Sequence, residues 1–479
     1  MQRATKIVAT LGPASSGAER LAELVAAGVD VVRLNFSHGA ADDHRQRVEA
    51  LRAAAHHAGR TVGVMADLQG PKIRIGKFAA GPIALKAGQH FILDAACQLG
   101  DATRVGLDYP ELVDDVAAGD VLLLDDGRMV FDVESIDGSE IHCRNRHDGE
   151  LSNNKGINKQ GGGLSAPALT VKDMADIKTA ALLNVDFVAV SFPKTGADMR
   201  QTRQLLHEAG SDALVIAKIE RIEAIDNLQD ILHATDGVMV ARGDLAVEVG
   251  DAAVPALQKR IIRMAREANR FVITATQMME SMISSPVPTR AEVSDVANAV
   301  LDGTDAVMLS AETASGAYPV AAVEAMVRVC VAAESSHEVK VDAHFLDRTF
   351  TRIDQSIAMA ALFTAVHMKV KAIAALTDSG STALWMSRIN SGVPIYALTP
   401  RSRTRYRVSI FRDVFPLITN FVKHDRDELL WQAEETLLAA SVVEEGDLIV
   451  LTTGEPIGLA GGTNTLKLVK VGEHRRPAI

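Results

Sequence analysis

The chain has 479 residues, too many for a single hydrophobic core, so we expect two or three domains. Hydrophobic residues make up 47% of the chain and charged residues 23%, as in ordinary globular proteins. The net charge of −11 argues against bulk binding of nucleic acid, and an aromatic content of 4% argues against stacked-base recognition. No apolar run approaches the roughly 20 residues that a membrane-spanning helix needs.

The three cysteines, Cys97, Cys143 and Cys330, lie far apart and have no metal-binding or redox spacing. Their spacing predicts reduced thiols. The first residues lead directly into a predicted strand, so we expect no signal peptide and a cytoplasmic location.

Strands and helices alternate over much of the chain. Helices are predicted at Ser16–Ala27, which ends at Gly28, and at Asp42–Ala58. Eight short apolar runs predict strands: Ile7–Leu11, Val31–Phe36, Val62–Ala66, Phe187–Ser191, Leu214–Ala217, Val238–Val240, Phe271–Ala275 and Ala306–Leu309. Eight such β/α units indicate an α/β fold, a closed parallel (β/α)8 TIM barrel with strands buried on both faces.

Two other regions complete the predicted domains. Residues 70–165 contain short apolar runs separated by Gly-Asp and Asp-Gly turns, which predict an inserted β-rich lid domain, a small β-barrel. Residues 338–479 predict a C-terminal doubly wound α/β domain, with a helix at Ser356–Val366 and strands at Ala372–Leu376, Ile395–Leu398, Leu448–Leu451 and Leu466–Val469. The catalytic barrel then comprises residues 1–69 and 166–337.

Polar side chains follow several predicted barrel strands, at the edge where the chemistry of such barrels gathers. Lys218 and Glu220 end the fifth strand and share one face of it, because they are two residues apart. The other strand ends carry Arg33, Asn35, Ser37, Asp67, Asp244, Thr276 and Glu312. A single ionic residue at a strand end is usually an ordinary surface residue. Several on one rim suggest a divalent-metal site beside a fixed cation, which suits a phosphorylated acid.

Longer strings resemble the pyruvate kinase family over nearly the full length. They are Lys6–Pro13, Arg33–Gly39, Ile216–Glu220, Ala241–Leu245, Ala275–Met278 and Ser310–Thr313. The resemblance implies a phosphotransferase that moves the phosphoryl group of phosphoenolpyruvate to ADP, giving pyruvate and ATP in the last step of glycolysis. It also implies a homotetramer, and a lid that closes over the barrel mouth.

The resemblance also assigns roles at the strand ends. Glu220 and Asp244 would hold Mg2+ or Mn2+. Lys218 and Arg33 would neutralise the phosphoryl group during transfer. Thr276 would pass a proton, through water, to the methylene carbon.

Further positions would bind the two substrates. Backbone N–H groups near Gly243 and Asp244 would hold the substrate carboxylate, and the nucleotide would contact Asn35, His38, Arg74 and Lys155. Structural alternatives exist for some of them: a loop cap for His38 and a solvated side chain for Lys155. A helix with Arg290, Asp295 and Asn298 is expected to serve subunit or rim packing.

One segment departs from the members that require K+. They carry Thr at the position of Leu68, Lys at Gln69 and Glu at Lys72, whereas this chain resembles a potassium-independent branch. We therefore expect the ammonium group of Lys72 to replace the monovalent cation near Asn35, Ser37 and Asp67, so that K+ is not required. If Lys72 instead points to solvent, K+ would still bind.

A hydroxyl-rich loop in the C-terminal region precedes a predicted helix and matches the family's effector loop. The residues that would cradle a phosphate are Thr377, Ser379, Gly380, Ser381 and Thr382. AMP or a sugar monophosphate is the expected allosteric effector. The loop itself has no basic residue, so charge would come from Arg401, Arg403, Arg405 and Arg407, which equally fit a solvated helical face.

Two other functions fit part of the pattern. A Mg2+-dependent barrel lyase would share the carboxylate pair but would not need ADP. A silent paralogue would bind effectors without turnover, although the intact Lys218, Glu220, Asp244 and Thr276 argue against it.

Overall fold

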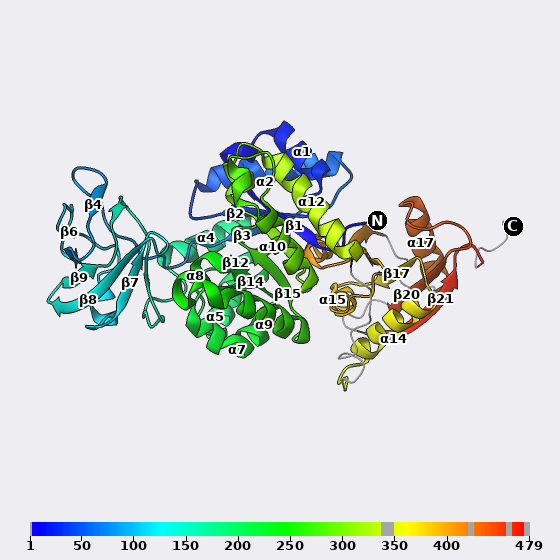
Figure 1. Cartoon of the computed structure of the whole chain (residues 1–479). Helices are drawn as coiled ribbons and strands as arrows, with labels where there is room; N and C mark the ends of the chain where they lie inside the picture. The colour runs from blue at the N-terminus through cyan, green and yellow to red at the C-terminus, as the bar shows by residue number, and fades with distance from the viewer. Residues whose placement is uncertain (1, 337–348, 420–425, 457–461, 474–479) are drawn as a thin grey trace.

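The computed structural model describes residues 2–336, 349–419, 426–456 and 462–473 (Figure 1). The predicted domain boundary at residue 337 lies outside these ranges. Eight parallel strands form a closed barrel in the order β1-β16-β15-β14-β13-β12-β3-β2, which confirms the predicted TIM-like barrel. The strands are β1 (Lys6–Leu11), β2 (Val31–Asn35), β3 (Gly63–Asp67), β12 (Phe187–Val190), β13 (Leu214–Ile219), β14 (Gly237–Ala241), β15 (Phe271–Ala275) and β16 (Ala306–Leu309).

Residues along each barrel strand alternate between two hydrophobic cores. On β13, Val215 and Ala217 pack outward in the core shared with the surrounding helices, whereas Ile216 belongs to the core inside the barrel. On β2, Val32 and Leu34 pack outward in the same way. Because successive strand side chains point to opposite faces, both faces are buried, and the strands read as continuous apolar runs.

Helices surround the barrel. They are α1 (Ala18–Ala27), α2 (Ala41–His57), α4 (Val171–Leu182), α5 (Gly196–Glu208), α6 (Ile222–Asp226), α7 (Leu228–Ala234), α8 (Arg242–Val249), α9 (Val254–Glu267), α10 (Arg290–Leu301), α11 (Ala311–Ala314) and α12 (Pro319–Ser336). The predicted end of α1 is confirmed at Gly28, whose φ of 118° suits glycine. No helix in the described ranges is both long and apolar enough to cross a membrane.

The inserted β-rich module projects from one end of the barrel (Figure 1). Six strands pair in the order β11-β7-β8-β9-β5-β6, and β4 pairs separately with β10. Their bounds are β4 (Ile83–Leu85), β5 (His90–Asp94), β6 (Arg104–Val105), β7 (Val121–Leu124), β8 (Met129–Asp137), β9 (Glu140–Asn145), β10 (Gly149–Leu151) and β11 (Ile157–Lys159), with the short helix α3 (Leu112–Asp115). Arg74 pairs with Gly156, next to β11, and Ile75 pairs with Leu107, next to β6, so one segment links the two edges of this sheet. The module is thus a separate β-sheet domain whose edges are joined, in agreement with the small β-barrel predicted. Phe91 and Phe131 lie in its own core.

The C-terminal module has a five-stranded sheet in the order β19-β18-β17-β20-β21, in which only β21 is antiparallel to its neighbour. Its elements are α14 (Ile353–His367), β17 (Ala372–Leu376), α15 (Ser381–Ser387), β18 (Ile395–Thr399), α16 (Ser402–Arg407), β19 (Val414–Ile418), α17 (Arg426–Ala439), β20 (Leu448–Gly454) and β21 (Thr463–Lys470). The predicted α/β domain is confirmed, but β19 was not predicted, because Pro416 lies within it. Proline is tolerated there because β19 is an edge strand.

The C-terminal module packs against the barrel end where the strands begin. The core inside the barrel continues into this module, and the rings of Phe271 and Phe411 lie 5.7 Å apart. The side chains of Arg388 and Asp305 form an ion pair across this contact and are each only 1% exposed. The carboxyl ends of the strands therefore face the other way, toward the β-sheet module.

Candidate active site

Inward-facing strand positions bring a set of charged side chains into the carboxyl end of the barrel. On β2, β3 and β13, the residues Val31, Met65 and Ile216 point into the barrel interior. Two positions later on each strand come Arg33, Asp67 and Lys218, which therefore point into the mouth. The alternation that builds the core also gathers these charges.

A buried carboxylate joins the two expected catalytic cations. Oδ2 of Asp67 accepts a hydrogen bond from Nε of Arg33 at 2.6 Å, and its Oδ1 lies 3.3 Å from Nζ of Lys218. The same ammonium group lies 2.9 Å from Oε1 of Glu220 and donates to the Ser191 hydroxyl at 2.7 Å. The structure thus brings together residues from β2, β3 and β13 that are far apart in the sequence.

These contacts determine the charge states in the mouth. Burial alone would raise the pKa of Asp67, but Lys218 and Arg33 outweigh burial and lower the pKa below its usual range. Burial disfavours the ammonium form of Lys218, yet the carboxylates of Asp67 and Glu220 raise its pKa. The ammonium group of Lys218 therefore remains charged at neutral pH, next to the position expected for a phosphoryl group.

Two carboxylates could hold a divalent metal ion here. Glu220 is 1% exposed, and its Oε2 accepts a hydrogen bond from the Phe192 N–H at 2.8 Å. Burial and the negative charge of Asp244 raise the pKa of Glu220, so these two carboxylates lie close enough to repel each other. A hard divalent cation with oxygen ligands would relieve that repulsion, so the pair fits Mg2+ or Mn2+. No cluster of three or more such ligands gathers in the described ranges, so further ligands would come from substrate or water.

Thr276 forms a hydrogen bond with Gly243, the residue that precedes Asp244. Thr276 follows β15 with a φ of 68°, and its hydroxyl donates to the Ala275 carbonyl at 2.6 Å. The same oxygen accepts a hydrogen bond from the Gly243 N–H at 2.9 Å. The expected proton donor and an expected carboxylate-binding N–H group are therefore neighbours.

The residues expected to bind the nucleotide form two separate pairs. Asn35 and His38 lie on the barrel side, where the His38 N–H donates to the Asn35 carbonyl at 3.1 Å. Arg74 and Lys155 lie side by side on the lid, since Ile75 N–H donates to the Lys155 carbonyl at 2.9 Å. No hydrogen bond or ion pair joins the two pairs in the described part of the chain. The Lys155 ammonium instead lies 2.7 Å from Asp125.

Lys72 does not point to solvent alone. Its ammonium lies 3.3 Å from Oδ1 of Asp244 and 4.0 Å from Asp126 of the lid. Within the described ranges it forms no ion pair with Asp67, although we expected it near that residue. Asn35 Oδ1 accepts the Ser37 N–H at 3.1 Å.

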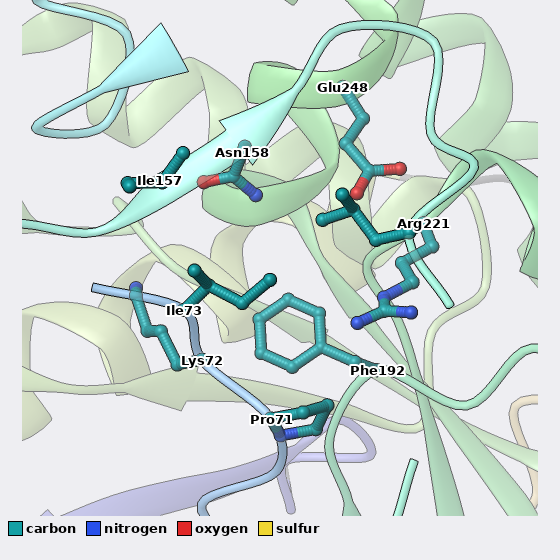
Figure 2. A pocket seen from close by; sticks show the side chains of 9 residues that line it. Pro71, Lys72, Ile73, Ile157, Asn158, Phe192, Arg221 and Glu248 are labelled. Atoms are coloured by element: carbon teal, nitrogen blue, oxygen red, sulfur yellow. The ribbon is translucent and has the colours of Figure 1, made fainter. Parts of the chain in front are cut away.

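A small pocket lies where the lid joins the barrel, and sequence reasoning missed it. Figure 2 shows Phe192, Arg221 and Glu248 from the barrel side converging on Ile73 and Asn158 from the lid side. Arg221 is 3% exposed, and its Nη1 has no hydrogen-bond partner. Burial raises the pKa of Glu248 to about 7. Two sequence signals could have revealed this pocket: Arg221 directly follows Glu220, and Glu248 lies one helical turn after Asp244.

The expected effector loop is held by hydroxyl groups of the loop itself and of Thr463 on β21. Thr377 Oγ1 accepts the Gly380 N–H at 2.8 Å, and the Thr382 and Thr463 hydroxyls are 2.6 Å apart. Arg401 lies beside the loop, 3.4 Å from Asp378. Two others of the arginine cluster, Arg403 and Arg407, pair with Asp212 of the barrel. Among the described residues, Arg401 is thus the one arginine of this cluster that forms an ion pair with the loop.

Comparison with known proteins agrees with this geometry. Residues 2–323 match the family model for the pyruvate kinase barrel domain, and residues 355–469 match the model for its alpha/beta domain. The chain is 50% identical to pyruvate kinase II of Salmonella typhimurium over 475 residues, which is 98% of this chain and 99% of that one. It is 51% identical to a pyruvate kinase of Haemophilus influenzae, over 94% and 96% of the two chains.

The fold has a relative among solved structures. A pyruvate kinase from Cryptosporidium parvum superimposes with a TM-score of 0.92 and 35% identity, covering 98% of this chain and 96% of the other. The chain is therefore a phosphotransferase that belongs to the pyruvate kinase family.

Proposed function

We propose that this chain transfers the phosphoryl group of phosphoenolpyruvate to ADP at the carboxyl end of its barrel. The observation that carries the proposal is the buried Asp67 carboxylate, which pairs with both Arg33 and Lys218 beside Glu220. Two fixed cations around one anion are poised to accept a dianionic phosphoryl group without reorganisation. Positioning and charge stabilisation are what phosphoryl transfer needs most.

The reaction has two steps, and different residues serve each of them. In the first, the bond between phosphorus and the enol oxygen breaks, and phosphorus bonds to a terminal oxygen of ADP while Arg33 and Lys218 neutralise its oxygens. When bound by Glu220 and Asp244, Mg2+ supplies a Lewis acid for these oxygens. In the second step the enolate of pyruvate gains a proton at its methylene carbon, which comes from water through the Thr276 hydroxyl. The Gly243 N–H holds that hydroxyl now and would bind the substrate carboxylate.

The lid supplies the nucleotide side of the site. Arg74 and Lys155 lie together on the lid, whereas Asn35 and His38 lie together on the barrel. Closing the lid would bring the two pairs around ADP and exclude water, which prevents hydrolysis of the phosphoryl group. We propose the predicted limits, residues 70–165, for this domain, between barrel residues 1–69 and 166–337 and C-terminal residues 338–479.

Activity without K+ is part of the proposal. Protein groups already occupy most oxygens of the expected cation site: both oxygens of Asp67 face cations, and Asn35 Oδ1 accepts the Ser37 N–H. Lys72 adds a tethered ammonium group beside Asp244. An assay in Na+ and tetramethylammonium buffers tests this, and a large stimulation by K+ would contradict it.

Regulation, assembly and location extend the proposal beyond the barrel. The loop with Thr377, Ser379, Gly380, Ser381 and Thr382 would bind AMP or a sugar monophosphate, supported by Arg401 at its edge. The enzyme would work as a homotetramer in the cytoplasm, as the family resemblance suggests. An effector panel and sedimentation measurements test these two parts.

The central test follows pyruvate formation from phosphoenolpyruvate with and without ADP, in the presence of Mg2+. We expect pyruvate and ATP in equal amounts, and no pyruvate when ADP is omitted. Pyruvate released without ADP would favour the lyase, and no turnover under any condition would favour a silent paralogue.

A further inference from the structure

The backbone that carries Thr276 is strained. After β15 ends at Ala275, both Thr276 and Gln277 adopt left-handed conformations, with φ of 68° and 53°. A β-branched residue such as threonine rarely adopts positive φ, because its side chain crowds the backbone. Such a turn persists only where its surroundings hold it, and strained residues of this kind gather at functional sites.

The guanidinium group of Arg242 holds this turn. Its Nε donates to the Ala275 carbonyl at 3.2 Å, and its Nη2 donates to the Thr276 carbonyl at 2.7 Å. The side chain of Arg242 is only 11% exposed, so these charge-assisted hydrogen bonds form away from bulk water. One planar side chain thus fixes consecutive carbonyls across the start of the strained turn.

Asp295 on α10 fixes the guanidinium group itself. Nη1 of Arg242 lies 2.7 Å from Oδ2 of Asp295 and 2.8 Å from its Oδ1. Gln258 of α9 accepts from the same nitrogen at 3.4 Å. Asp295, expected to serve packing, therefore also reaches the active-site backbone through Arg242.

Arg242 and its neighbour Gly243 both bind Thr276, one at its backbone and the other at its side chain. The arginine binds the Thr276 carbonyl, while the Gly243 N–H binds the Thr276 hydroxyl at 2.9 Å. We infer that Arg242 is a positioning residue, oriented by Asp295, that aims the Thr276 hydroxyl for proton transfer to the enolate carbon. This inference rests on the proposed proton-transfer role of Thr276. It assigns Arg242 no contact with the substrate.

The test separates proton transfer from substrate binding and from folding. Arg242→Lys keeps the positive charge but cannot bridge the carbonyls and Asp295 at once. Asp295→Asn keeps the shape of the anchor and removes its charge. Arg200→Lys, in an exposed ion pair with Asp230 on the same barrel, serves as the matched control. Each protein is assayed for kcat, for KM of phosphoenolpyruvate, and for exchange of pyruvate methyl protons in D2O with Mg2+ and ATP.

We expect Arg242→Lys to slow methyl-proton exchange and kcat about 10- to 100-fold, because a small misplacement of a catalytic group has a large effect. Asp295→Asn should slow both about 3- to 10-fold, with KM changed less than about threefold and the unfolding midpoint near that of Arg200→Lys. If folded Arg242→Lys and Asp295→Asn both exchanged the methyl protons as fast as the wild-type protein, the inference would be overturned. Loss of kcat with unchanged exchange would also overturn it.

Failure of the proposed function gives a different result. In that case the wild-type protein itself would neither form pyruvate from phosphoenolpyruvate and ADP nor exchange the methyl protons. An active wild-type enzyme with indistinguishable variants would defeat only the role of Arg242.

Discussion

Nε of Arg33 lies 2.6 Å from Oδ2 of Asp67, and the carboxylate is 1% exposed. Arg33 lies within β2 and Asp67 ends the neighbouring strand β3, and both point inward because each lies two positions after a residue of the interior core. Asp67 therefore works as a buried anchor, which holds a cation in the barrel mouth before any substrate arrives.

Asp67→Asn should weaken both catalysis and stability. The substitution keeps the side-chain shape but leaves Arg33 and Lys218 without their shared anion, so we expect kcat to fall about 10- to 100-fold. Breaking a buried ion pair should lower the free energy of unfolding by about 3 kcal/mol at pH 7. Because the folded-state pKa of Asp67 is lowered, its contribution is present above the unfolded pKa and lost as the pH falls through the folded pKa. Denaturant unfolding at pH 7 and in acid checks this; an equal difference at both pH values would contradict it.

Lys72→Glu should create a dependence on K+. The ammonium group beside Asp244 would be replaced by a second carboxylate, which repels Asp244 and leaves room for a monovalent cation. We expect activity in K+-free buffer to fall about 10- to 100-fold and to recover partly on adding K+. Assays with K+, Na+ and tetramethylammonium check this. Equal loss in all three salts would mean that Lys72 acts only through Asp244.

Glu248→Gln should stabilise the metal-free protein at alkaline pH. Burial raises the folded-state pKa of Glu248 to about 7, well above its ordinary value, so the folded protein binds the proton more tightly. Stability then declines as the pH rises from the unfolded to the folded pKa, and the full penalty is present above about pH 7. Glutamine keeps an acceptor for the Ile222 N–H and has no charge, so it should gain about 1–3 kcal/mol at pH 8. Thermal unfolding from pH 4 to pH 9 in EDTA is the measurement. A gain of the same size at pH 4 would contradict the assignment.

Arg388→Met should loosen the C-terminal module from the barrel. Arg388 is almost fully buried, donates to the Arg270 carbonyl, and pairs with Asp305. Leaving Asp305 buried without its cation should cost about 3–5 kcal/mol. Lys86→Met is the matched control, because the pair of Lys86 and Asp148 is exposed and should change stability by less than about 1 kcal/mol. Equal unfolding midpoints for the two variants would show that this buried pair contributes little.

Much of the barrel could be predicted because its strands are marked by short patterns of consecutive residues. Apolar runs defined its strands, and two-residue spacing predicted that Lys218 and Glu220 share a side. Strand β19 was missed because Pro416 interrupts its pattern. The turns of the lid indicated that it is rich in β-strands but not which of its strands pair. Closure depends on pairings between distant strands, which sequence patterns do not reveal.

Parts of the site depended on contacts that no spacing predicts. Lys72 pairs with Asp244, which follows it by 172 residues, and Arg242 reaches the carbonyls of a turn 34 residues later. The left-handed conformation of Thr276 gives no sequence signal, because threonine does not favour it. Such contacts form only once the barrel has brought its loops together.

The most direct measurement is the turnover of Lys218→Met with phosphoenolpyruvate, ADP and Mg2+. Lys178→Met, on the exposed face of α4, is the matched control, and circular dichroism checks that both variants fold. We predict that kcat falls at least about 10²- to 10³-fold for Lys218→Met and stays unchanged for Lys178→Met. A folded Lys218→Met variant with activity within about tenfold of the wild type would contradict the central role of the buried cations.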